Sequence, residues 1–191
     1  RSAYYLLMTL PFKGYVTTNF DPLLKEAGKN HGINNVEFYP NLNILKLTED
    51  SHAIFYIHGL ARPENTPVGN NLVLSSSEFN EAYYEMGVVG SFLHQLLSFN
   101  NIIFLGCDIQ EPSVKEIIKK AMKVRMQIQY AVPNTPLCKR IIILPTEINK
   151  TFTREDMVEK KIKEHIIEKE REEDIQFINL GFEPIRFEKS D

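Results

Sequence analysis

The sequence predicts an α/β protein in which a mostly parallel sheet lies between two layers of helices. Its strands are indicated by four apolar runs, at residues 15–18, 53–57, 102–105 and 141–144. These runs are continuously apolar, which is typical of strands covered on both faces; a strand with one face in water alternates apolar and polar residues. Helical patterns lie between the runs, so strands and helices alternate along the chain. The predicted fold is a Rossmann-like three-layer sandwich.

The predicted helices have recognisable starts. Asp21 and Pro22 fit an N-cap and a first helical position, and they open a short helix that stops at Gly28. Residues 92–97 form an apolar helical face just before the third strand. After that strand, Pro112 opens a helix whose apolar stripe includes Val114, Ile117, Ile118, Ala121 and Met122.

The C-terminal part is predicted to add one helix and one strand. Residues 153–174 are densely charged, but Val158, Ile162 and Ile166 recur at four-residue spacing, which indicates a solvated helix docked by one stripe. A final apolar segment, 177–178 and then 182–187, predicts an edge strand, because Pro184 cannot donate a hydrogen bond within a central strand.

Composition limits the class of protein. With 191 residues and 43% hydrophobic content, the chain fits one domain spanning 1–191. The net charge is -3, and the Lys and Arg residues do not gather into a basic run, so direct nucleic-acid binding is not expected. The two cysteines form no CxxC pair, so no metal site is expected. The sequence contains no apolar span or leader, which predicts a cytoplasmic protein without a membrane segment.

Polar or glycine residues follow three of the predicted strands, where open α/β sheets bind ligands. Asn19 follows the first, His58 and Gly59 the second, and Gly106 the third. Each has a purely structural alternative. Asn19 fits a turn, His58 fits a structural histidine, and Gly106 fits an ordinary strand-to-helix turn.

The combination, however, resembles a known family. The order and spacing of Thr18-Asn19-Phe20-Asp21, then His58-Gly59, then Gly106-Cys107-Asp108 with Glu111-Pro112, are similar to those of sirtuins. The resemblance covers about residues 14–144 and is closest to the zinc-free SIR2-like domains of bacterial antiphage defence proteins.

This resemblance implies an enzyme that hydrolyses NAD to nicotinamide and ADP-ribose without a metal. Asn19 and His58 are the implied catalytic residues: Asn19 orients the ribose and the attacking water, and His58 acts as a base or hydrogen-bond partner for the ribose hydroxyls. Asp21 would bind the nicotinamide amide. The implied NAD-binding residues are Thr18, Asn19, Phe20, Asp21, His58, Gly59, Gly106, Cys107 and Asp108.

The resemblance also implies a homo-oligomer whose activity is regulated by a defence-system partner or a phage activator.

The sequence departs from the family pattern at several positions, and these departures leave functions other than NAD hydrolysis open. The Gly-rich phosphate loop of the family does not occur in the sequence, so the first strand and this loop are expected either upstream of Arg1, where the chain enters directly into a helix-like segment, or to have been lost. Asp108 stands where the family usually has a hydroxyl residue, and Glu111 replaces the usual aspartate. The competing hypothesis is a catalytically weak nucleotide-sensing or scaffolding module. Protein deacylation is the less favoured enzymatic interpretation, because the sequence lacks the zinc ribbon of protein deacylases.

Overall fold

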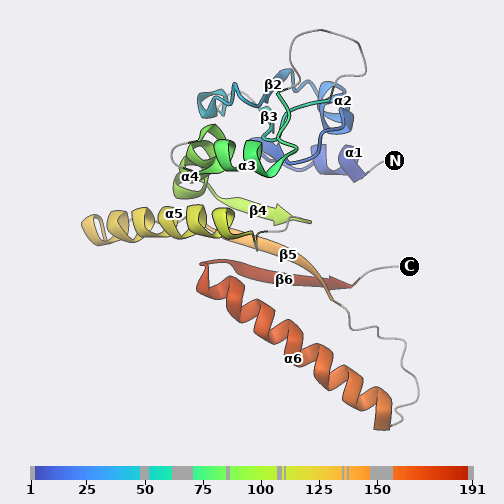
Figure 1. Cartoon of the computed structure of the whole chain (residues 1–191). Coiled ribbons are helices and arrows are strands. Elements are labelled where there is room, and N and C mark those ends of the chain that lie inside the picture. Colours follow the sequence, from blue (N-terminus) through green and yellow to red (C-terminus); the bar gives the residue numbers. More distant parts are fainter. Residues whose placement is uncertain are drawn as a thin grey trace. The chain divides into compact units, whose positions relative to one another are not determined.

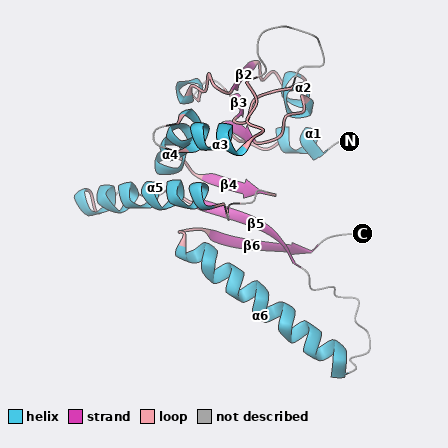
Figure 2. Cartoon of the chain, in the orientation of Figure 1, coloured by secondary structure: helices cyan, strands magenta, loops and turns pink. Residues whose placement is uncertain are grey.

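The computed structural model describes residues 3–47, 52–61, 71–84, 87–106, 109, 111–134, 136, 138–146 and 157–188. The chain divides into two compact units, Arg1–Leu96 and Leu97–Asp191. The boundary falls within one helix, α4 (Val88–Phe99). Each unit is an alternation of strands and helices (Figure 2).

The first unit is built on a three-stranded parallel sheet (Figure 1). The strand order is β1-β3-β2, and both outer strands run parallel to β3. Its elements in chain order are α1 (Ala3–Met8), β1 (Gly14–Thr17), α2 (Leu23–Lys29), β2 (Asn35–Phe38), a short 3₁₀ helix (Ile44–Lys46), β3 (Ala53–Tyr56), α3 (Ser76–Tyr83) and the first part of α4.

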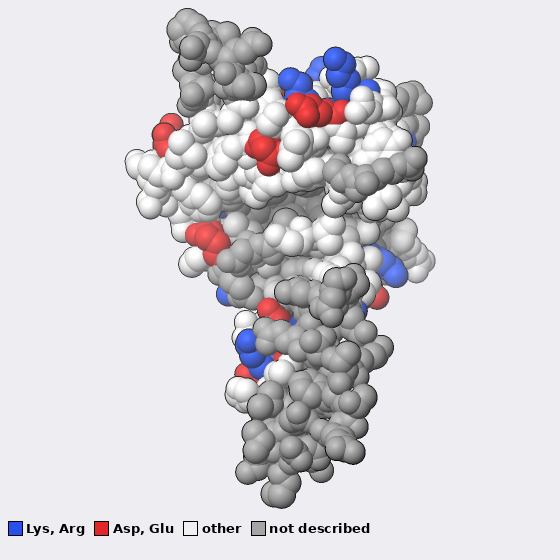
Figure 3. Space-filling model, turned by 90° about the vertical axis from the view of Figure 1, so that its right-hand side faces the viewer, with Lys and Arg blue, Asp and Glu red and all other residues white. Residues whose placement is uncertain are grey.

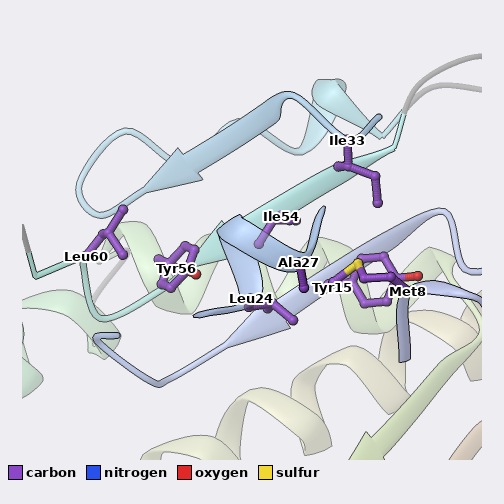
Figure 4. Close-up of a cluster of buried hydrophobic side chains, with 8 residues drawn as sticks. All are labelled: Met8, Tyr15, Leu24, Ala27, Ile33, Ile54, Tyr56 and Leu60. Atoms are coloured by element: carbon purple, nitrogen blue, oxygen red, sulfur yellow. The ribbon is translucent and has the colours of Figure 1, made fainter. Parts of the chain in front are cut away.

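The central strand β3 is buried along its whole length, as its apolar run predicts. Ile54 and Tyr56 belong to a cluster with side chains from α1, β1 and α2, which Figure 4 shows. Phe55, between them, points to the opposite face, where its ring lies 4.8 Å from the Phe92 ring of α4. The cluster comprises Met8, Tyr15, Leu24, Ala27, Ile33, Ile54, Tyr56 and Leu60.

The second unit is also built on a three-stranded parallel sheet. Its sheet has the order β4-β5-β6, with parallel neighbours throughout. Its elements are the end of α4, β4 (Ile102–Leu105), α5 (Pro112–Ala131), β5 (Arg140–Thr146), α6 (Met157–Asn179) and β6 (Glu183–Glu188). Arg186 of β6 ties the strand to α6 through Glu173 at 2.7 Å and Asp174 at 2.9 Å.

The predicted α/β class with parallel strands is confirmed, and so are the four strand runs and the edge position of the last strand. Several details differ from the sequence prediction. The helix α3 was not predicted, and α2 begins at Leu23 and ends at Lys29, whereas the predicted helix opens at Pro22 and stops at Gly28. Residues 177–178 lie in the last turns of α6, where Phe177 is buried, and do not belong to the final strand. The strand β2 was not predicted. The predicted helix start at Thr153 lies outside the described residues.

Among the described residues, no helix is both long and apolar enough to span a membrane.

Candidate functional site

The loops that follow β1 and β3 run together at the carboxyl edge of the first sheet. The Ile57 N–H donates to the Thr17 carbonyl at 3.1 Å, and the Ala61 N–H donates to the Phe20 carbonyl at 2.8 Å. Because β1 and β3 are parallel neighbours, Asn19 and His58 emerge at the same edge. The predicted convergence of these two residues therefore agrees with the geometry.

Asn19 is held from two sides and remains exposed. Its backbone N–H donates to the Thr17 hydroxyl at 3.0 Å, and its side-chain Nδ2 donates to the Tyr4 hydroxyl at 3.1 Å. The amide oxygen has no hydrogen-bond partner among the described residues. Asn19 thus presents a fixed acceptor, and Tyr4 of α1 is a contributor that the sequence analysis missed.

Asp21 is not the N-cap that the sequence predicts, because α2 begins one residue later, at Leu23, and Pro22 is its N-cap. One carboxylate oxygen accepts the Leu23 N–H at 3.0 Å, where α2 begins. Nearby, the Tyr56 hydroxyl accepts the Lys25 N–H at 2.9 Å, and burial raises the pKa of Tyr56 to about 12. The start of α2 is therefore fixed to the sheet edge beside Asn19.

His58 is half-buried in an aromatic surrounding. Its Nε2 lies 2.6 Å from the Tyr83 hydroxyl, and the rings of Phe20 and Phe79 each lie with their centroids 6.1 Å from the imidazole. Burial lowers the pKa of His58 below its ordinary value, so the imidazole is neutral at neutral pH. Tyr83 was also missed by the sequence analysis.

The backbone conformation and the packing around position 59 both require a glycine there. Its φ is +91°, and a Cβ at this position would lie 2.4 Å from the Asn71 carbonyl oxygen. The neighbouring Val73 N–H donates to the His58 carbonyl at 2.9 Å. The close approach at Gly59 is thus made by the backbone of the segment that precedes α3.

The third element lies in the second unit. Gly106 directly follows β4 with φ +62°, is exposed, and has open space where a Cβ would stand. Cys107 and Asp108 lie outside the described residues. Glu111 caps α5: its carboxylate accepts the Val114 N–H at 2.9 Å and the Ser113 hydroxyl. The glutamate that replaces the family's aspartate therefore still serves as a helix cap. The predicted place of Gly106 beside Asn19 stays a prediction.

Within the described ranges, no three His, Cys, Asp or Glu side chains are grouped so as to hold a metal ion. On the face drawn in Figure 3, acidic and basic side chains are interspersed among neutral ones.

Parallel strands with polar side chains at their carboxyl edge are typical of the class of α/β proteins that bind a ligand at that edge. The model of the family described as SIR2-like domain matches residues 13–167, which is most of the chain. The chain belongs to this SIR2-like family. Membership implies NAD-dependent activity in general, and NAD is the ligand that SIR2-like domains bind. No curated protein matches the chain.

Proposed function

We propose that this chain is an NAD glycohydrolase, which uses water to split NAD into nicotinamide and ADP-ribose. The observation that carries the proposal is the pairing of the loops after β1 and β3, because it sets Asn19 and His58 at one sheet edge. The family match spans both compact units, which supports one SIR2-like domain over 1–191.

The donor and acceptor set at this edge fits the nicotinamide-ribose end of NAD. Asn19 offers an exposed amide oxygen, Asp21 keeps one carboxylate oxygen beyond its hydrogen bond with Leu23, and His58 is neutral and half-buried. Hydroxyl and carboxamide groups are natural partners for these side chains. When bound, NAD supplies a glycosidic bond whose cleavage releases neutral nicotinamide.

In the proposed mechanism, the residues position the reactants and stabilise the charge that develops on the ribose. Asn19 orients the ribose and the attacking water, and Asp21 accepts from the nicotinamide amide. His58 acts as base or hydrogen-bond partner toward the ribose hydroxyls. The remaining residues proposed to line the NAD site are Thr18, Phe20, Gly59, Gly106, Cys107 and Asp108.

The proposed setting is regulated antiphage defence in the cytoplasm. Unchecked hydrolysis would deplete the cell's NAD, so activity is proposed to await a signal from a phage component or a defence-system partner, within a homo-oligomer. The two isolated cysteines of the sequence favour a zinc-free subtype, since a structural zinc site needs four ligands.

A second function is favoured by one residue. Asp108 follows the strand end at Gly106, and a carboxylate at this place repels a phosphate. If that repulsion abolishes catalysis, the chain serves as a nucleotide-sensing or scaffolding module. Deacylation has less support, because the sequence lacks the zinc ribbon that frames an acyl-lysine peptide.

The test compares Asn19→Ala and His58→Ala with the parent chain and with Asn41→Ala, which removes an exposed amide elsewhere in the first unit. Nicotinamide release from NAD is measured with and without candidate activators, and melting temperature is measured alongside. We expect the first two variants to stay folded and lose about 10²–10⁴-fold in rate, while Asn41→Ala keeps the parental rate.

Two results count against this mechanism. If an activated parent cleaves NAD and both folded variants keep its rate, Asn19 and His58 are only structural. If the parent binds NAD but releases no nicotinamide under any activator, the sensing module is the better account.

A further inference from the structure

The two nitrogens of His58 have different surroundings. Nε2 lies 2.6 Å from the Tyr83 hydroxyl, whereas Nδ1 forms no hydrogen bond within the part of the chain that the structure describes. Whatever group His58 meets at the sheet edge is therefore met through Nδ1. What Nδ1 offers, a proton or a lone pair, depends on the direction of the bond to Tyr83.

Tyr83 is a rigid partner. It is the last residue of α3, it is 5% exposed, and its ring stacks on Phe79 at 4.1 Å with an interplanar angle of 11°. The helix is anchored at its other end by a capping box formed by Ser75 and Glu78. The hydroxyl is thus held in place by the packing of the helix.

The chemistry favours a bond in which the tyrosine donates. A phenol O–H is more acidic than the N–H of neutral imidazole and is the stronger donor. Hydroxyl donors also give shorter bonds than N–H donors, whose distances centre on about 2.9–3.0 Å. The 2.6 Å separation lies at the short end. A neutral imidazole that accepts at Nε2 must carry its proton on Nδ1.

We propose that Tyr83 is a positioning residue that donates to Nε2 of neutral His58 and so fixes the tautomer protonated on Nδ1. His58 then presents an N–H donor at the sheet edge. For the proposed NAD hydrolysis, on which this consequence rests, His58 is the hydrogen-bond partner of a ribose oxygen and does not act as the base.

The tautomer is measured directly by nitrogen-15 NMR of the His58 ring in the full chain without NAD, with His58→Ala used to assign the signals. We expect the parent to show the Nδ1–H tautomer. Tyr83→Phe keeps the ring and its stacking but removes the donor, so it should shift His58 toward the Nε2–H tautomer that predominates in water.

The same change should raise the pKa of His58, because the lost bond stabilised its neutral form. Among the described residues, the side chains whose rings face the imidazole are Phe20, Phe79 and Tyr83, and of these three only Tyr83 titrates. Tyr84→Phe is the matched control. It removes the hydroxyl of the next, exposed tyrosine and should leave both the tautomer and the pKa unchanged.

A parent spectrum with the Nε2–H tautomer overturns the proposal, and so does a Tyr83→Phe spectrum identical to that of the parent. Nicotinamide release, measured on the same proteins, separates this inference from the proposed function. We expect roughly tenfold slower release by Tyr83→Phe, the scale of one lost neutral hydrogen bond. If the tautomer is as proposed but no protein releases nicotinamide, the positioning role stands and the NAD glycohydrolase proposal falls.

Discussion

Replacing Gly59 by alanine should destabilise the first unit more than the same change at Gly32, the other glycine with a positive φ among the described residues of this unit. At φ +91° an L-residue costs about 1–2 kcal/mol in backbone strain. The added Cβ would also lie 2.4 Å from the Asn71 carbonyl oxygen and 2.8 Å from Leu72 Cδ2. The carbonyl is backbone, and the adjoining Val73 N–H is bonded to the His58 carbonyl, so this segment cannot move without breaking a contact. We expect a total loss of about 3 kcal/mol.

Gly32→Ala is the matched control, because Gly32 also has a positive φ, +78°, but open space around the missing Cβ. Its cost is the strain alone, partly offset by the reduced freedom of the unfolded chain, which leaves about 1 kcal/mol. For a chain of this size, 1 kcal/mol lowers Tm by roughly 2–4 °C. Calorimetry should therefore show Tm falling by about 6–12 °C for Gly59→Ala and about 2–4 °C for Gly32→Ala. Equal losses in the two variants would refute the packing of Asn71 against the turn after β3.

Two further substitutions test local energetics. Ser75→Ala removes the side chain that accepts the Glu78 N–H at 3.2 Å and should cost about 1 kcal/mol in urea denaturation, whereas Ser77→Ala, at an exposed helical position, should cost far less. Equal costs would mean that the cap contributes nothing. Arg140 is 2% exposed, and its Nη2 donates to the Leu97 carbonyl at 3.2 Å, whereas its Nε and Nη1 have no hydrogen-bond partner among the residues that the structure describes. Burial lowers the pKa of Arg140 to about 10, so the penalty for its charge is fully present at pH 7 and fades only as pH rises through that value. Arg140→Met should therefore raise the free energy of unfolding by about 1–3 kcal/mol at neutral pH, and a less stable variant would contradict the unpaired charge.

The strands show what an apolar run does and does not predict. Continuous apolar character predicts burial on both faces of a strand, and all four residues of β3 are buried. In the second unit, however, Leu105, Ile143 and Ile185 are aligned across the sheet, and Leu105 and Ile185 are 51% and 45% exposed. The run of residue types indicates that a strand tends to be buried, but it carries no information on which segment covers each face.

Two elements, β2 and α3, were not predicted, β2 because its sequence pattern is weak and α3 because its helix-start pattern was not used. β2 (Asn35–Phe38) is four half-buried residues with polar side chains among them, so neither period stands out over such a short length. The pattern Ser75-x-x-Glu78, in contrast, is the sequence signature of a capping box. Read as a helix start, it would have predicted α3, whose last residue is Tyr83.

The candidate site, too, could be predicted from the sequence only in part. Asn19 and His58 could be placed at one edge from sequence, because parallel strands end on the same side of a sheet and polar residues directly follow two apolar runs. The partners that orient them could not. Tyr4 lies 15 residues before Asn19 and Tyr83 lies 25 residues after His58, and no local pattern links either pair. The sheet therefore determines where the imidazole stands, whereas packing of α3 determines which nitrogen carries its proton. A substitution in α3 should for this reason change the chemistry of the edge without moving any residue on β1 or β3.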